Sequence, residues 1–173
     1  SAYTTFANGG IRCAPLFVTK IEDSHGNVIA KFQPLMTEVI SEVSSYQMID
    51  MLRAVIQGGT GSRLRYAYHL TADMGGKTGT TNNNADGWFM GITPNLVSGC
   101  WVGGEDRDIH FDHTSMGQGA TMALPVWAYY MQRVYADKRL GYSQSTKFTM
   151  PAKFNPCQTA DTINVNGIQE EYF

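Results

Sequence analysis

Met74-Gly75-Gly76-Lys77-Thr78-Gly79-Thr80-Thr81 is the most informative segment of this sequence. In an extended segment with a two-residue period, the side chains of Thr78 and Thr80 project from one face. Lys77 projects from the other face, but its flexible stem allows the ammonium to reach round the strand edge. Gly79 has no side chain to keep another backbone away, so a ligand can pair with this strand. The segment therefore predicts a site for an anionic, peptide-like ligand, because an ammonium and two hydroxyls suit a carboxylate.

Two known motifs are similar to this segment. The phosphate-binding loop G-x-x-x-x-G-K-[ST] is half matched by Gly76-Lys77-Thr78, but it needs a glycine at Thr71 and a helix directly after the lysine. Gly79 and the run Asn82-Asn83-Asn84 disfavour that helix. The K-T-G element of penicillin-binding proteins and serine β-lactamases fits better, because it lies on a strand. An accidental tripeptide in an ordinary strand is the remaining alternative for Lys77-Thr78-Gly79 taken alone.

Length and charge exclude several classes of protein. The 173 residues suffice for one domain or for part of a larger one. The net charge of −2 and the lack of a basic cluster predict no nucleic-acid partner. The sequence has neither an 18-residue apolar run nor the pattern of a signal peptide. If the protein acts outside the cytoplasm, we expect its targeting segment upstream of this chain.

The cysteines and the acidic residues point to no metal site. Cys13, Cys100 and Cys157 lack metal-ligand spacing. Cys100 falls in an apolar strand and is predicted to be a buried free thiol, whereas a disulfide between Cys13 and Cys157 stays open. The segment Glu105–His113 is rich in Asp and His, but without a helical frame it is more typical of a solvated loop. We expect neither a metal nor another cofactor.

Periodicity and turn residues predict the other elements. From the N-terminus these are a helix ending before Gly9-Gly10, a hairpin of residues 16–22 and 28–32, a helix over 41–57, a short helix over 63–70, two strands over 88–93 and 96–103, and a helix over 122–137. Gly58-Gly59-Thr60-Gly61-Ser62 follows a helix rather than a strand, so it is interpreted as a helix stop and flexible loop, not a phosphate cradle.

Specific side chains can be assigned to core or surface from these elements. Arg63 and Arg65 are expected on the solvated side of the short helix. Both long strands are apolar on both faces, so Trp88, Phe89 and Trp101 are expected in a core covered on each side. Pro125 is expected in the first turn of the last helix.

Beyond the K-T-G element, the chain resembles the C-terminal part of the transpeptidase domain of class A, bifunctional penicillin-binding proteins. The resemblance covers residues 2–137 in consistent order. It is carried by Tyr3-Thr4-Thr5-Phe6-Ala7-Asn8-Gly9-Gly10, Lys20-Ile21-Glu22-Asp23, Met51-Leu52-Arg53-Ala54-Val55, Gly59-Thr60-Gly61, Lys77-Thr78-Gly79-Thr80, Asp86-Gly87-Trp88-Phe89-Met90-Gly91-Ile92-Thr93-Pro94, Trp101-Val102-Gly103-Gly104, Gly117-Gln118-Gly119-Ala120 and Ala123-Leu124-Pro125-Val126-Trp127.

The chain departs from the family pattern in one respect. Such enzymes carry S-x-x-K, then S-x-N, then K-T-G, and here no serine has a lysine three residues later or an asparagine two later. We therefore expect residues 1–137 to be the C-terminal portion of a transpeptidase domain whose nucleophile lies upstream, and residues 138–173 to be an irregular tail. This chain alone is then expected to be inactive and to expose apolar surface where upstream helices would pack.

The resemblance implies an α+β fold, similar to that of serine β-lactamases, with helices packed on the faces of an antiparallel sheet. It implies a serine-type D-Ala-D-Ala transpeptidase that cross-links peptidoglycan stem peptides and is acylated by β-lactams. Lys77, Thr78, Gly79 and Thr80 would bind the substrate. Lys77 would also act in catalysis, and the backbone N–H of Thr80 would be one of two oxyanion donors.

The whole protein would, on the same resemblance, also carry a glycosyltransferase. It would work in the cell envelope, on the periplasmic side of the bacterial inner membrane, anchored by a transmembrane helix upstream of this chain. Two alternatives stay open: a β-lactamase or D,D-carboxypeptidase of the same fold, and a non-catalytic binding module. The acceptor amine, the stem-peptide variant and the role of residues 138–173 do not follow from the sequence.

Overall fold

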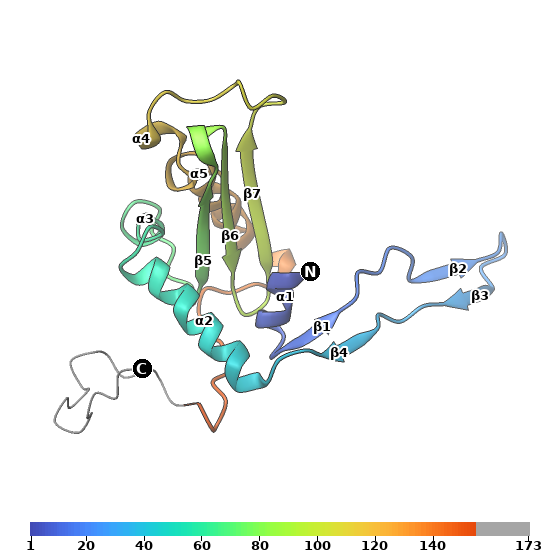
Figure 1. Ribbon diagram of the computed structural model, residues 1–173. Helices are drawn as coiled ribbons and strands as arrows, with labels where there is room; N and C mark the ends of the chain where they lie inside the picture. Colours follow the sequence, from blue (N-terminus) through green and yellow to red (C-terminus); the bar gives the residue numbers. More distant parts are fainter. Residues whose placement is uncertain (155–173) are drawn as a thin grey trace, which may run out of the picture.

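A three-stranded antiparallel sheet forms the centre of the computed structural model, which describes residues 1–154 (Figure 1). Its order is β5-β6-β7, formed by Gly75–Thr80, Asp86–Ile92 and Val97–Gly103. The turn after β6 is closed by Thr93, whose hydroxyl accepts from the Leu96 amide at 3.1 Å. The predicted pair of apolar strands is confirmed, with β6 beginning two residues earlier than expected.

Five α-helices surround or adjoin this sheet in the described residues. They are α1 (Ala2–Ala7), α2 (Glu42–Gln57), α3 (Arg63–Tyr66), α4 (Thr114–Gly117) and α5 (Gly119–Ala136), with 3-10 turns η1 (Asn82–Asn84) and η2 (Lys138–Leu140). The predicted helix over 41–57 is confirmed. Its N-cap Ser41 accepts a hydrogen bond from the Ser44 amide at 3.1 Å, which satisfies one of the amides left free at a helix start.

Helix α5 begins earlier than predicted. It starts at Gly119, so Pro125 lies inside the helix, and the expectation of Pro125 in its first turn was wrong. A proline in the second turn removes one backbone hydrogen bond, and the helix continues past it because its buried face, with Trp127 and Met131, is held by the core.

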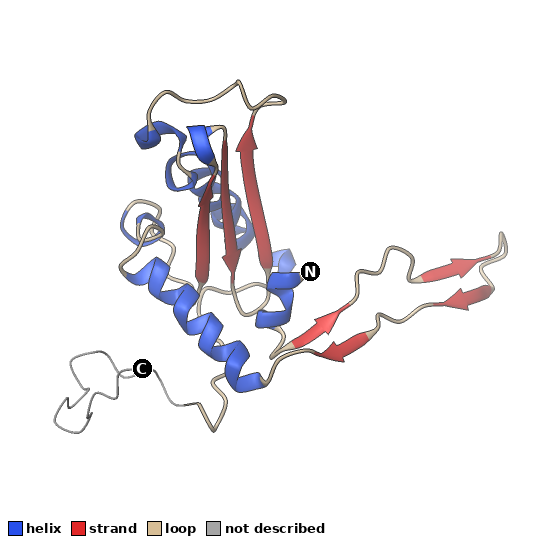
Figure 2. Ribbon diagram, in the orientation of Figure 1, coloured by secondary structure: helices blue, strands red, loops and turns tan. Residues whose placement is uncertain are grey.

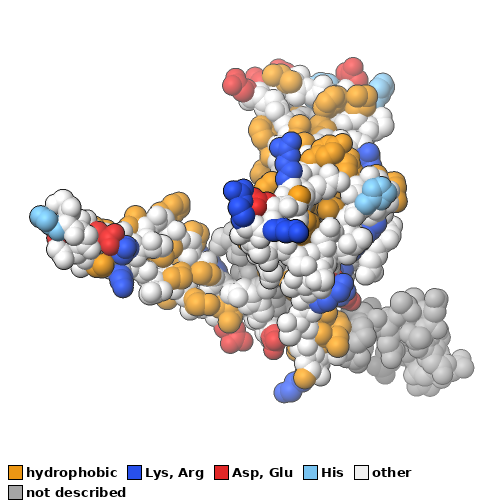
Figure 3. All heavy atoms as spheres, turned by 180° about the vertical axis from the view of Figure 1, so that it is seen from behind, with side chains coloured by type: hydrophobic (Ala, Val, Ile, Leu, Met, Phe, Trp, Pro, Cys, Tyr) orange, Lys and Arg blue, Asp and Glu red, His pale blue; other side chains and the backbone are white. Residues whose placement is uncertain are grey.

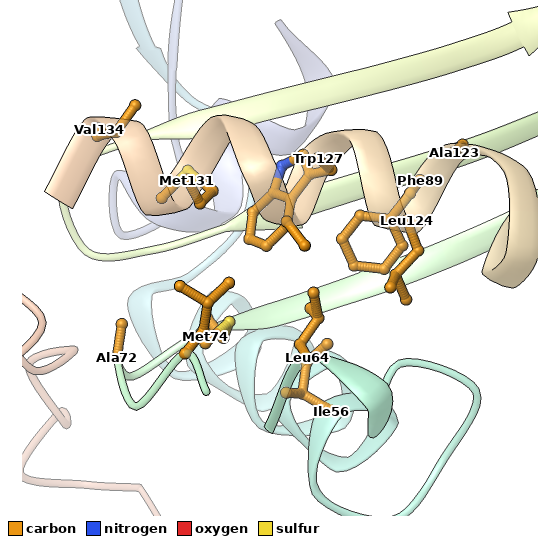
Figure 4. Packing of buried hydrophobic residues seen from close by; sticks show 12 residues of the cluster. Ile56, Leu64, Ala72, Met74, Phe89, Ala123, Leu124, Trp127, Met131 and Val134 are labelled. Carbon is orange, nitrogen blue, oxygen red and sulfur yellow. The ribbon is translucent and has the colours of Figure 1, made fainter. Parts of the chain in front are cut away.

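One face of the sheet packs against α5 (Figures 1 and 4). Phe89 of β6 is fully buried and meets Trp127 of α5 edge to face, with ring centroids 5.0 Å apart. Gly91 makes room for this indole, since a Cβ there would lie 2.1 Å from Trp127 Cζ2. The indole N–H donates to Ser98 Oγ at 2.8 Å, so the polar atom of this buried ring is satisfied.

The other face of the sheet is more open in the described residues. Trp88 and Trp101 are cross-strand partners on it and are 46% and 47% exposed, so the expectation that both lie in the core was wrong. Because side chains alternate along a strand, these two point away from α5 while Phe89 points toward it. Helix α2 packs where β5 begins and β6 ends, since Leu52 lies against Gly75 and belongs to one buried cluster with Ile92. The sheet therefore exposes apolar surface, as expected.

Residues 11–39 form an arm that projects away from the sheet and its helices (Figures 1 and 2). Its base pairs β1 (Ile11–Cys13) with β4 (Met36–Glu38), and its tip pairs β2 (Lys20–Glu22) with β3 (Val28–Lys31). The predicted hairpin is confirmed, with strands shorter than expected. Hydrophobic side chains are exposed along the arm (Figure 3), including Phe17, which is 96% exposed.

Residues 138–154 have little regular structure and contact the segment that precedes β5. Gln144 Oε1 accepts from the Thr71 amide at 2.7 Å, and Asp73 Oδ2 accepts from the Phe148 amide at 3.1 Å. Asp73 is buried and paired with Arg53 Nε at 2.9 Å. These contacts attach the segment to the base of β5. The possible partner of Cys13, Cys157, lies outside the described residues.

Two further expectations were wrong in part. Arg63 and Arg65 are half-buried rather than solvated, because their guanidinium groups donate to the carbonyls of Ala120 at 3.2 Å and Leu70 at 2.7 Å. Cys100 is partly buried and packs beside the main core. Burial raises the pKa of its thiol, since the thiolate is poorly solvated there.

Candidate functional site

Strand β5 is an edge strand of the sheet formed by the described residues. The Thr81 amide donates to the Asp86 carbonyl at 3.1 Å, so the backbone groups of Thr81 point toward β6. In an antiparallel ladder the direction alternates along the strand. The N–H and C=O groups of Thr78 and Thr80 therefore point away from β6, to the open edge, where an extended ligand can pair with them.

The ammonium of Lys77 lies at this same edge. The register pairs Lys77 with Met90, on the face opposite Phe89, yet Nζ donates to the Thr78 carbonyl at 2.6 Å. The long stem thus carries the charge of Lys77 round the strand edge, away from the face on which side-chain alternation places this residue. Among residues 1–154, Lys77 takes part in none of the ion pairs, so its charge is available to an anionic ligand.

The hydroxyls of Thr78 and Thr80 lie on one face, as the two-residue period predicts, but each has its own partner. Thr78 Oγ1 is 3.1 Å from Thr60 Oγ1, in the loop between α2 and α3. Thr80 Oγ1 accepts from the Gly119 amide at 3.0 Å, at the start of α5. The strand is therefore attached to two different segments at the two positions where hydroxyls were expected to face a ligand.

Glycines allow these close contacts. A Cβ on Gly79 would lie 3.2 Å from the Cβ of its cross-strand partner Trp88, on the Lys77 face of the sheet. A Cβ on Gly119 would lie 2.3 Å from the Gly79 carbonyl oxygen and 2.4 Å from that of Trp88. Helix α5 can therefore approach β5 only because position 119 has no side chain.

Thr60 and Gly119 are contacts that sequence analysis did not predict. Both lie in glycine-rich segments, which show that backbones approach closely there but not which strand they approach. A hollow of about 370 Å³, lined by residues of α1 and α2, by Pro94 and Asn95 and by residues 146–151, contains none of the predicted site residues. The candidate site is thus an open strand edge rather than an enclosed cavity.

The described residues contain no cluster of metal-ligating side chains. Within residues 1–154, no group of three His, Cys, Asp or Glu side chains converges on a point where a metal ion could bind. The Glu105–His113 loop is exposed, as predicted. None of the helices in this part of the chain combines the length and the apolar character that a membrane span requires.

Residues 1–98 match the family model described as the penicillin binding protein transpeptidase domain. The chain belongs to this family. Penicillin-binding protein 1A of Aquifex aeolicus (strain VF5) is 40% identical to it over 134 residues, which are 78% of this chain and 18% of that protein. Penicillin-binding protein 1A of Neisseria gonorrhoeae is 39% identical over 147 residues, 80% of this chain and 17% of that protein. The chain thus spans less than a fifth of these penicillin-binding proteins.

Solved structures of penicillin-binding proteins have the same fold. Penicillin-binding protein 1A from Haemophilus influenzae is similar with a TM-score of 0.67 at 26% identity, over 79% of this chain and 26% of that chain. PonA1 from Mycobacterium tuberculosis is similar with a TM-score of 0.69 at 24% identity, over 99% of this chain and 45% of that chain. These likenesses confirm the predicted α+β fold. The family match and the curated relatives confirm the resemblance to class A penicillin-binding proteins.

Proposed function

We propose that this chain is the K-T-G-bearing part of a peptidoglycan D,D-transpeptidase that works through an acyl-serine intermediate and is acylated by β-lactams. The observation that carries the proposal is the open edge of β5, where the Lys77 ammonium and the outward backbone groups of Thr78 and Thr80 lie together. Membership of the transpeptidase family supports it. As the chain spans only part of its relatives, the activity is proposed for the whole protein.

The proposed chemistry is a two-step acyl transfer. A serine outside this chain attacks the D-Ala-D-Ala carbonyl of a stem peptide, and the terminal D-alanine leaves as the acyl-enzyme forms. An amine of a neighbouring stem peptide then attacks the acyl-enzyme and forms the cross-link. Lys77, with the hydroxyls of Thr78 and Thr80, binds the carboxylate of the donor peptide.

The backbone of β5 has a second role in this proposal. The outward N–H of Thr80 donates to the developing oxyanion, while the extended donor peptide lies along β5 and pairs with its outward backbone groups. Gly79 has no side chain that would obstruct that peptide. A β-lactam occupies the same edge, because it presents an acyl group and a carboxylate in a similar arrangement. The protein then belongs to the cell envelope, on the periplasmic side of the inner membrane.

The test is intact-mass analysis of the full-length protein after incubation with a penicillin. We expect one covalent acyl adduct. In Lys77→Ala the rate of acylation should fall about ten- to a hundredfold, the worth of a hydrogen bond between charged groups. Lys31→Ala is the matched control, since it removes the same charge from the exposed arm and should leave the rate unchanged.

The alternatives predict different products. A β-lactamase would release the adduct within minutes, and a D,D-carboxypeptidase would release D-alanine from stem peptides without forming peptide dimers. A full-length protein that is never acylated would be a binding module, and the proposal would then be abandoned. Dimers of stem peptides, detected by mass spectrometry, together with a stable penicillin adduct, are the expected result.

A further inference from the structure

The loop Gly58–Ser62 joins α2 to α3. None of the residues of this loop is a ligand-binding group in the proposed function. It was interpreted from sequence as a helix stop and a flexible loop. In the structure it brings Thr60 to the middle of β5, where Thr60 Oγ1 lies 3.1 Å from Thr78 Oγ1. Eighteen residues separate the two hydroxyls in sequence, so this contact depends on the tertiary fold.

The backbone of this loop is held in place. The Gly61 amide donates to the Val55 carbonyl at 3.0 Å, and the Ser62 amide donates to the Gly59 carbonyl at 3.1 Å. A Cβ on Gly59 would lie 2.9 Å from Val55 Cα, and one on Gly61 would lie 2.6 Å from Ile56 Cδ1. The two glycines thus pack directly on the end of α2.

Between these glycines, Thr60 carries the one side chain of the tripeptide, and that side chain is exposed. Its position follows from the packing of its neighbours on α2 rather than from contacts of its own within the core. A change confined to the Thr60 side chain therefore leaves the loop backbone supported.

The contact of two hydroxyls has a consequence for the direction of their protons. Each hydroxyl has one proton to donate and lone pairs that accept. If Thr78 donates to Thr60, it presents only lone pairs to an incoming carboxylate, which is repulsive. If Thr60 donates to Thr78, the proton of Thr78 is free to point at the carboxylate beside the Lys77 ammonium. An anion at the edge selects the second arrangement.

We propose that Thr60 is a positioning residue of the site: its hydroxyl donates to Thr78, so that the Thr78 hydroxyl donates to the terminal carboxylate of the ligand. This inference rests on the proposed function and adds a group to the same site. A chain of two hydrogen bonds also strengthens the outer one, because each bond polarises the next. Thr60 acts through Thr78 and need not touch the ligand.

The experiment compares Thr60→Val, which keeps the shape and removes the hydroxyl, with Thr60→Ser, which keeps the hydroxyl. Both are made in the full-length protein, together with Thr78→Val and the double variant Thr60→Val/Thr78→Val. The probes are benzylpenicillin and its methyl ester, which lacks the charge of the carboxylate. The readout is the second-order rate of acylation by intact-mass analysis, with thermal unfolding recorded for each variant.

We expect Thr60→Val to react with benzylpenicillin about five- to tenfold more slowly than wild type, as for one hydrogen bond. Thr60→Ser should restore most of the rate. The methyl ester should react with Thr60→Val and wild type at the same rate. In the Thr78→Val background, Thr60→Val should have no further effect, because the two residues act as a pair.

A purely structural role gives a different pattern. It would slow the acid and the ester equally, lower the unfolding temperature, and add to the effect of Thr78→Val; any of these results overturns the inference. An unchanged rate for Thr60→Val with benzylpenicillin also overturns it and leaves the proposed function intact. Failure of the proposed function is distinguishable because it appears in the wild type itself, as no adduct with either probe, as an adduct that is released within minutes, or as a lack of stem-peptide dimers.

Discussion

Replacing Gly119 by Ala tests whether the approach of α5 to β5 is as close as the structure describes. The new Cβ would lie 2.3 Å from the Gly79 carbonyl oxygen and 2.4 Å from the Trp88 carbonyl oxygen. Unstrained carbon–oxygen contacts are about 3.3–3.6 Å, so the start of α5 must move by about 1 Å. Both obstacles are backbone atoms of paired strands, which cannot rotate aside as a flexible side chain would.

The expected cost follows from two opposing terms. Overpacking against fixed atoms costs about 3 kcal/mol, while alanine gains at most about 1 kcal/mol over glycine in a helix. The net loss of about 2 kcal/mol should lower the unfolding temperature by about 4–8 °C in a chain of this size. Differential scanning calorimetry or circular dichroism measures this change.

Gly58→Ala is the matched control for this substitution. Gly58 has a φ of −146°, which alanine adopts, and nothing lies within 4 Å of an added Cβ. Its effect should stay within about 0.5 kcal/mol. In the full-length protein Gly119→Ala should also slow acylation by penicillin, because it displaces the amide that donates to Thr80 Oγ1. If Gly119→Ala unfolds at the temperature of wild type, the close contact between α5 and β5 is wrong.

Two further predictions concern groups outside the β5 edge. Asp73→Ala should lower the free energy of unfolding by about 2 kcal/mol, which is less than for a fully buried ion pair because the Arg53 side chain is a quarter exposed. Hydrogen exchange at the Phe148 amide should become faster at the same time, because this amide loses its acceptor. An unchanged exchange rate would contradict the contact with residues 138–154. The alkylation rate of Cys100, followed as a function of pH, should have its midpoint at a higher pH in the folded protein than in urea. Burial raises the pKa of the thiol, and a higher pKa leaves less thiolate at a given pH. Peptide mapping assigns the site, and an equal or lower midpoint in the folded protein would refute the prediction.

The sequence carried enough local signal for most of the elements. Alternating and helical periodicity located α2, the β6–β7 pair and the tip of the arm, because each pattern extends over several residues. Helix boundaries near glycine and proline were predicted less accurately: α5 starts at Gly119, although the sequence Gly117-Gln118-Gly119 favours a loop. The prediction that Trp88 and Trp101 are buried was wrong. An apolar side chain indicates that a position tends to be covered, but not which element covers it.

The sequence by itself determined the character of β5: a lysine on one face, two threonines on the other, and a glycine between them, which follow from the two-residue period of any strand. The motif order in the chain also indicated its family. Only the tertiary structure decided that β5 lies at an open edge, that the Lys77 ammonium reaches this edge, and that Thr60 and Gly119 contact the two hydroxyls. Such contacts join residues 18 and 39 positions apart, and long-range packing, rather than local backbone preference, determines which of them meet.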